Sequence, residues 1–154
     1  MTEIQGCNFP EEGISYDVEN QMWVRFDDDG SITSGLTDIG QHIAGHILYV
    51  RPRKIGEDVR KGKRVAIIES GKYVGPINSP LSGKIIEVNS KVLENAGIIN
   101  DEPYGEGWVF RLKPSGLEKE ESGLLEGAAA MVAIKDKLER ESWDCFSRRG
   151  NDGR

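Results

Sequence analysis

The fold of this chain is decided by residues 62–83, which read GKRVAIIESGKYVGPINSPLSG. The run VAII is apolar and mostly β-branched, which is typical of a buried strand. The polar residues ESGK that follow include a glycine and predict a turn. The next segment is apolar again, but its Gly75 and Pro76 restrict it to an edge strand or an irregular strand. We therefore predict a β-hairpin with Lys72 at or beside its tip.

Lys72 would extend its ε-amine into solvent from such a tip. Because most lysines are exposed, position alone makes it an ordinary surface side chain. The residues around it favour a second interpretation. Glu69 lies three residues before the lysine, and a second turn, PLSG, ends at Gly83.

These residues resemble the lipoyl-lysine hairpin of the glycine cleavage H-protein family. The family pattern reads ES-x-K and, further on, SP-x-SG-x-x-x-EVN. This chain has ESGK at 69–72 and SPLSGKIIEVN at 79–89. A third segment, NDEPYGEGW at 100–108, is similar to the N-x-x-PYGEGW that precedes the last strand in the family. The resemblance covers roughly residues 17–114, with the motifs in the same order.

The fold class that we predict is mainly β. Two similar units, KGKRVAIIE at 61–69 and SGKIIE at 82–87, lie on either side of the hairpin tip. Such units suit a flattened barrel-sandwich of two small sheets, which leaves few open edges. The resemblance implies the same lipoyl/biotinyl-carrier-like hybrid, with a short internal helix and C-terminal helices. We expect a single domain over 1–146 and a mobile tail over 147–154.

Two helical regions are also predicted. Thr37 or Asp38 caps a short helix that runs to about Ala44 and ends at Gly45. Further on, SGLE at 115–118 matches a capping box. An apolar stripe at helical spacing follows, and its residues are Leu124, Leu125, Met131, Ile134 and Leu138. This stripe predicts one or two helices packed on the sheets.

In the family, lipoate is joined by an amide to the hairpin lysine, which corresponds to Lys72. Glu69 and Gly56, three and sixteen residues before it, resemble positions that the modifying lipoate ligase or lipoyl transferase reads. Acylation removes the charge of the amine, so a long arm can lie on an apolar surface or swing away. The resemblance implies a carrier and not an enzyme. Its arm would move a covalent intermediate between partners that include dihydrolipoamide dehydrogenase.

The pathway depends on positions where the chain departs from the family pattern. H proteins have Ser-His-Glu-Trp at the first strand, where this chain has NQMW, so Met22 stands in place of a carboxylate. A second acidic residue, four after the lysine, is Pro76 here. With Tyr73, these residues form the expected surroundings of the arm. Two carboxylates that would pair with the ammonium of an aminomethyl-loaded arm are thus replaced.

Three functions stay open. The segments GCNFPE at 6–11 and ESGKYVGP at 69–76 resemble the H-like lipoate-binding proteins of sulfur oxidisers, which work with a heterodisulfide-reductase-like complex. We predict this carrier role first. The alternative is a glycine cleavage H protein that serves glycine decarboxylase and aminomethyltransferase. The third is an unmodified structural homologue. No Ser/His/Asp or Cys/His constellation and no phosphate loop indicates catalysis.

Two patterns raise the question of metal binding. His42 and His46 lie four residues apart and could form a zinc pair, but Gly45 ends the helix between them and no third ligand is near in sequence. The DDDG at 27–30 begins like a calcium loop but lacks the distant glutamate and the flanking helices. It predicts a tight turn between two strands instead. We expect no metal site.

Composition limits the partners and the compartment. The 154 residues include 20 basic and 26 acidic side chains, a net charge of −6, so nucleic acid is not an expected partner. No apolar run spans a membrane and the start lacks signal-peptide features, which predicts a cytoplasmic protein. We expect a monomer. Cys7 and Cys145 lie near opposite ends, and we expect free thiols, with a disulfide as the alternative.

Overall fold

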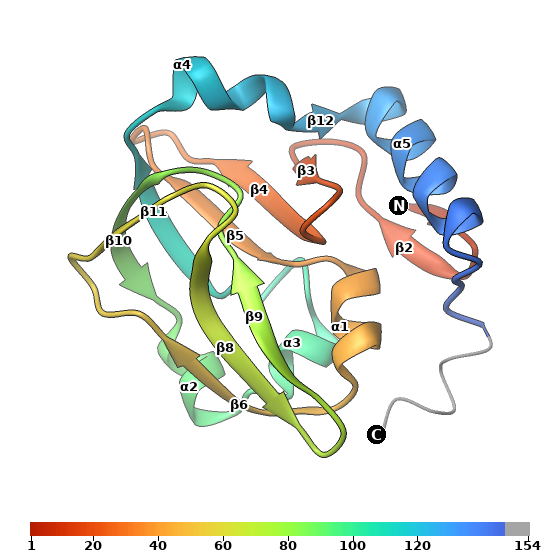
Figure 1. The fold of residues 1–154 in the computed structure, drawn as a ribbon, viewed down its shortest axis with the longest axis horizontal. Coiled ribbons are helices and arrows are strands. Elements are labelled where there is room, and N and C mark those ends of the chain that lie inside the picture. The colour runs from red at the N-terminus through yellow and green to blue at the C-terminus, as the bar shows by residue number, and fades with distance from the viewer. Residues whose placement is uncertain (147–154) are drawn as a thin grey trace.

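The structure is a computed structural model that describes residues 1–146 (Figure 1). The strands are β1 (Thr2–Ile4), β2 (Cys7–Phe9), β3 (Ser15–Asp17), β4 (Met22–Phe26), β5 (Ile32–Leu36), β6 (Ile47–Pro52), β7 (Asp58–Val59), β8 (Arg64–Ser70), β9 (Val74–Asn78), β10 (Gly83–Val88), β11 (Phe110–Pro114) and β12 (Leu125–Glu126). The helices are α1 (Asp38–Ala44), α2 (Ser90–Glu94), α3 (Ile98–Asp101), α4 (Leu117–Glu120), the 3-10 turn η1 (Glu121–Gly123) and α5 (Gly127–Arg140). The tail predicted at 147–154 lies outside the described residues.

Within residues 1–146, the strands form three antiparallel sheets. The largest has the order β12-β3-β4-β5-β11-β10-β7, the second has the order β6-β8-β9, and β1 pairs with β2. One core joins the two larger sheets, since buried Val24 and Ile32 of the first pack in one cluster with Ile68 and Ile77 of the second. The fold is mainly β, as predicted. The sheets do not close into a barrel in this part of the chain.

The predicted hairpin is formed by β8 and β9. These strands pair antiparallel from Arg64 to Asn78, and Ser70 donates its backbone N–H to the carbonyl oxygen of Tyr73 at 2.8 Å to close the turn. The hydroxyl of Ser70 also donates to the carbonyl oxygen of Ala44 at 2.6 Å, at the end of α1. The base of the turn is thereby fixed to the body of the protein. Figure 1 shows the hairpin projecting away from α4.

Helix α1 has the ends that the sequence predicts. The hydroxyl of Thr37 accepts the N–H of Gly40, and Gly45 ends the helix with a φ of +78°, which favours glycine. His42 is buried and its Nε2 lies 3.4 Å from Oδ1 of Asp38. His46 is exposed beyond the break. The two histidines therefore do not form a zinc pair on one helix face, because the helix ends at Gly45 and leaves His42 buried and His46 exposed.

A second core lies between α5 and the N-terminal segment. Ile134 and Leu138 of α5 pack in a cluster with Tyr16 of β3 and Trp23 of β4, all buried. Burying each such side chain stabilises the fold by about 1.5–3 kcal/mol. The indole N–H of Trp23 donates to the carbonyl oxygen of Pro103 at 2.8 Å, so the indole polar atom is also paired. No helix within residues 1–146 is long and apolar enough to cross a membrane.

The prediction of two free thiols is wrong. Cys7 and Cys145 are joined by a disulfide, with their Cα atoms 5.3 Å apart. Cys7 lies on β2, and Cys145 follows α5, whose packing returns the chain to the N-terminal hairpin. There, Cys145 also donates its backbone N–H to the carbonyl oxygen of Gln5 at 2.8 Å. A separation of 138 residues hides this contact from any local pattern.

The predicted capping box is wrong as well. Helix α4 begins after Gly116 and has no side-chain cap, while Ser115 donates its backbone N–H to the carbonyl oxygen of Ser82. Ser115 thus continues the pairing of β11 with β10 and does not start a helix. The helical stripe is confirmed from Met131 onward, but Leu125 belongs to β12, which pairs with β3.

Candidate functional site

Lys72 is exposed on the turn between β8 and β9. Its backbone N–H donates to the hydroxyl of Ser70 at 3.3 Å, which orients the turn. A Cβ built on the neighbouring Gly71 would meet no atom within 4 Å, so the tip lies in open space. Because an antiparallel strand pair and the contact to α1 hold its base, the tip presents the lysine from a rigid support.

The outer face of the β6-β8-β9 sheet lies beside this lysine. Glu69 pairs across the sheet with Tyr49 on one side and with Val74 on the other, and both neighbours are exposed, at 61% and 69%. The carboxylate of Glu69 accepts a hydrogen bond from Nε of Arg51 at 2.8 Å. The surface next to Lys72 is therefore apolar with one ion pair. The period-two alternation of β6 could have predicted that Tyr49 and Arg51 share this face.

The two residues predicted to guide lipoylation are separated in space. Glu69 lies at the tip end of β8. Gly56 follows β6, whose Pro52 end pairs with Ala66, at the opposite end of that sheet from Lys72. Gly56 has a φ of +96° and donates its N–H to the carbonyl oxygen of Ile85 at 2.7 Å. A turn conformation explains the glycine at this position.

The residues predicted to surround the arm are only partly brought together. Pro76 is exposed on β9, and Tyr73 is partly buried against the core with its ring over Gly75, where a Cβ would clash. Met22 is fully buried in that core and presents no surface beside the hairpin. The sequence comparison placed Met22 next to an arm, but β4 turns this side chain inward.

A polar contact that the sequence did not predict joins the hairpin to the first strands. Nδ2 of Asn78, at the end of β9, donates to Oδ1 of Asn20 at 3.4 Å. Asn20 in turn donates from its own Nδ2 to Asp17 at 2.7 Å. This contact ties the two larger sheets together at the end of the hairpin that lies away from Lys72.

Packed β-sheets with a lysine at the exposed tip of a hairpin are typical of one class of protein, the carriers that hold a prosthetic group on that lysine. The model of the family Glycine cleavage H-protein matches residues 14–137. This chain belongs to the glycine cleavage H-protein family. Proteins of this family are carriers, not catalysts, and they hold lipoate covalently on a lysine.

Individual relatives agree with this assignment. Glycine cleavage system H protein 2 of Aquifex aeolicus is 42% identical over 149 residues, which cover 97% of this chain and 92% of that protein. Probable glycine cleavage system H protein 2 of Saccharolobus solfataricus is 38% identical over 147 residues, covering 94% and 98%. The crystal structure of a glycine cleavage system H protein from Mycobacterium marinum superposes with a TM-score of 0.70 at 27% identity, covering 81% of this chain and 97% of that one.

The hairpin fits a lipoyl group. An acyl chain on the exposed Lys72 would leave from open space at Gly71, and the apolar side chains of Tyr49 and Val74 offer a surface for its hydrocarbon part. Acylation would also remove a charge from the tip, which favours contact with such a surface.

Proposed function

We propose that Lys72 is the lysine that carries lipoate and that this protein is the lipoyl carrier of glycine cleavage. The observation that carries the proposal is the position of Lys72, exposed at the tip of a hairpin with a fixed base, in a chain of the H-protein family. The lipoyl group, when bound, supplies a disulfide that can be reduced to a dithiol. The chain supplies the support and the surface that partner enzymes recognise.

The contribution of each residue follows from its contacts. Ser70 fixes the turn through Ala44 and Lys72, so the attachment point keeps one orientation. Glu69, held by Arg51, offers a carboxylate to a lipoate ligase or lipoyl transferase. Tyr49 and Val74 form the apolar surface beside the lysine. The partners would be glycine decarboxylase, aminomethyltransferase and dihydrolipoamide dehydrogenase.

The first test is the modification itself. Intact-mass analysis of protein from its natural source should show one lipoyl group per chain, and in vitro lipoylation should modify the wild type but not Lys72→Arg. Lys84→Arg, a change at another exposed lysine, serves as the matched control and should be modified normally. An unmodified mass from cells with a working lipoylation pathway would refute the proposal.

A second candidate function is a carrier role in sulfur oxidation with a heterodisulfide-reductase-like complex. It is favoured by the exposed Pro76 and by the exposed, uncharged side chains of Tyr49 and Val74 on either side of Glu69, since an arm loaded with sulfur needs no carboxylate to pair with an ammonium. Relatives numbered 2, 3 and 5 in Aquifex aeolicus also show that one organism can hold several H proteins. Different copies in one organism could serve different partner enzymes.

Turnover with purified partners separates the two functions. Glycine-dependent turnover with glycine decarboxylase and aminomethyltransferase is compared with that of an authentic H protein at equal lipoylation. Comparable rates support glycine cleavage. A rate reduced at least tenfold, together with acceptance of sulfur from a persulfide donor by the reduced protein, supports the sulfur carrier instead.

A further inference from the structure

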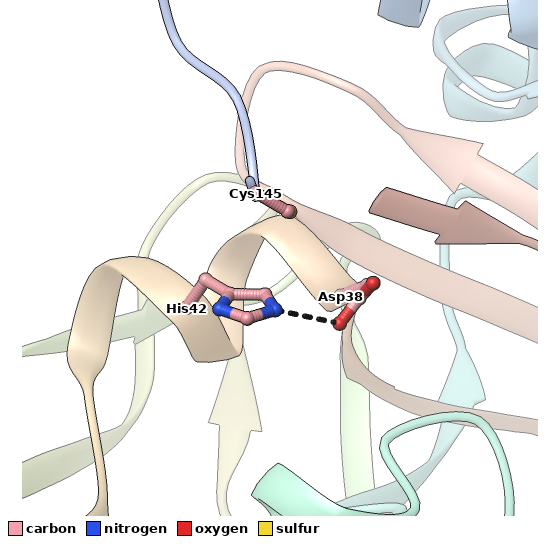
Figure 2. Close-up of side chains that lie close together, drawn as sticks. All are labelled: Asp38, His42 and Cys145. Carbon is pink, nitrogen blue, oxygen red and sulfur yellow. Dashed lines mark ion pairs between the residues drawn. The ribbon is translucent and has the colours of Figure 1, made fainter. Parts of the chain in front are cut away.

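A second group of reactive side chains lies away from the hairpin, where α1 meets both ends of the chain. Asp38 and His42 share one face of α1, and Cys145 lies over them (Figure 2). One possible ligand atom from each of these three residues lies within 4.8 Å of the others. All three side chains are buried, as is Cys7. Nothing in the proposed carrier function uses this group.

The spacing of Asp38 and His42 matches a tetrahedral zinc site. Nε2 of His42 lies 3.4 Å from Oδ1 of Asp38. Two N or O ligands bound to tetrahedral Zn²⁺ lie roughly 3.3–3.4 Å apart, given bond lengths of about 2.0–2.1 Å. A thiolate ligand would need to lie roughly 3.5 Å from each. The ligand atom of Cys145 lies within 4.8 Å of those of Asp38 and His42, so neither distance has to shorten by more than about 1.3 Å.

Cys7 can supply the fourth ligand. Its sulfur is bonded to that of Cys145, and the next residue on β2, Asn8, donates its backbone N–H to Oδ2 of Asp38 at 2.8 Å. The strand that bears Cys7 is therefore attached to the same carboxylate. Zinc binds the thiolate form of cysteine. The two sulfurs cannot bind it while they are joined in the disulfide.

We propose that reduction of the Cys7–Cys145 disulfide creates a zinc site formed by Cys7, Cys145, His42 and Asp38. A dithiol reductant donates two electrons and two protons, the S–S bond breaks, two thiols form and the reductant becomes a disulfide. Zn²⁺ then displaces both thiol protons to solvent and binds neutral His42 and ionised Asp38. The site is independent of the modification of Lys72.

The surroundings support such a site. Gln41 donates from Nε2 to Oδ1 of Asp38 at 2.8 Å, and Asn8 donates to Oδ2, so an outer shell of donors already orients the carboxylate. These donors also offset the net charge of −1 that two thiolates, one carboxylate and Zn²⁺ would give. A cavity of about 510 Å³ is lined in part by Asn8, Asp38 and His42, so open space adjoins two of the four proposed ligands.

Cobalt binding tests the proposal. The chain is reduced anaerobically with a phosphine, which competes for metal less than a dithiol does, the excess phosphine is removed, and the chain is titrated with Co²⁺. We expect one Co²⁺ per chain, a tetrahedral spectrum with thiolate-to-cobalt charge transfer, and loss of that spectrum when Zn²⁺ is added. The oxidised chain should show none of these features. His42→Ala should weaken Co²⁺ binding at least about 100-fold, because even outer-shell partners are worth 10–100-fold.

His46→Ala is the matched control, since it removes the other histidine of the chain from an exposed position four residues away. It should bind Co²⁺ as the wild type does. Far-UV circular dichroism follows the fold throughout, because a reduced chain that unfolds alone should refold when Co²⁺ is added. The proposal is overturned if reduced wild type gives no thiolate band, if it stays unfolded with Co²⁺, or if His42→Ala binds as tightly as wild type.

Discussion

At the scale of single residues, Glu69 is well placed for the lipoylating enzyme to contact it together with Lys72. It lies three positions away, at the tip end of β8, and Arg51 holds its carboxylate at 2.8 Å. The pair is partly exposed, so its contribution to stability is small, whereas its position on the face beside the lysine suits contact with an enzyme.

We predict that Glu69→Ala slows lipoylation of Lys72 by about tenfold, the equivalent of roughly 1.4 kcal/mol lost from a contact with the modifying enzyme. The free energy of unfolding should fall by less than about 0.5 kcal/mol, as is usual at surface positions. Time courses of intact mass and urea unfolding measure the two effects. Glu106→Ala, which also removes an exposed carboxylate from an ion pair, is the control. Equal rates for the two variants would contradict the prediction.

Gly56 offers a contrasting case, because its position in the fold explains it without any enzyme. We predict that Gly56→Ala lowers the free energy of unfolding by about 1–2 kcal/mol, since a φ of +96° is unfavourable for any residue with a Cβ. Under conditions where the variant stays folded, lipoylation should proceed at the wild-type rate. A folded variant that is modified slowly would instead support the role in recognition that the family resemblance implies.

At the scale of elements, the disulfide attaches the segment after α5 to the N-terminal hairpin. Helix α5 contributes Ile134 and Leu138 to the second core, and the bond between Cys7 and Cys145 keeps the two ends together. Among the described residues, the buried side chains of the β8–β9 hairpin belong to the other core. The two parts of the molecule should therefore respond differently when the disulfide is removed.

We predict that Cys7→Ser with Cys145→Ser lowers the free energy of unfolding by about 2–5 kcal/mol, because a long loop is no longer closed in the unfolded chain. Lipoylation of Lys72 in the folded variant should stay within about twofold of wild type, since a stability difference in the second core does not reach the hairpin. Urea unfolding and mass time courses provide the measurements. An unchanged midpoint in urea would show that the bond adds no stability.

At the scale of the whole molecule, two tyrosines connect the N-terminal segment to the rest of the fold: Tyr16 of β3, which is buried, and Tyr104, which is partly buried. The hydroxyl of Tyr104 accepts the N–H of Asp38 at 2.9 Å and donates to the carbonyl oxygen of Asn8 at 2.7 Å. Tyr16 donates its hydroxyl to the carbonyl oxygen of Pro10. Burial raises the pKa of both phenols above the ordinary value of 10.0, with the charge of Glu11 adding to the effect at Tyr16.

These shifts predict a loss of stability in alkali. Both phenols stay neutral in the folded state while those of the unfolded chain ionise above pH 10.0, so stability is complete below that pH and falls above it. Above pH 10.0, each tyrosine should lower the free energy of unfolding by up to about 1.4 kcal/mol per pH unit. Urea unfolding at pH 9 and at about pH 11 measures the slope. The free energy of unfolding of Tyr16→Phe should be about 1 kcal/mol lower than that of the wild type at pH 9, but it should fall less between pH 9 and pH 11. An equal fall in both proteins would exclude Tyr16 as a cause of the alkaline loss of stability.

The parts of this protein that were predicted correctly are those in which neighbouring residues carry the whole signal. Thr37 caps α1 and Gly45 ends it through contacts within one or two turns. The hairpin around Lys72 follows from two apolar runs and the polar turn between them. The DDDG segment forms a tight turn, with Gly30 at a φ of +86°. The family motifs are also contiguous, so the class of carrier could be identified before the fold was known.

Contacts between distant residues were decided only by the tertiary structure. Packing of α5 against β3 and β4 brought Cys145 to Cys7, and both to Asp38 and His42, although only Asp38 and His42 lie near each other in the sequence. Met22, which stands where the family has a carboxylate, was expected beside the arm yet points into the core, because the pairing of β4 with β5 sets which face each side chain takes. A local pattern fixes backbone conformation, whereas burial and long-range pairing depend on how all the elements pack. The hairpin could therefore be predicted from the sequence, and the cluster at α1 could not.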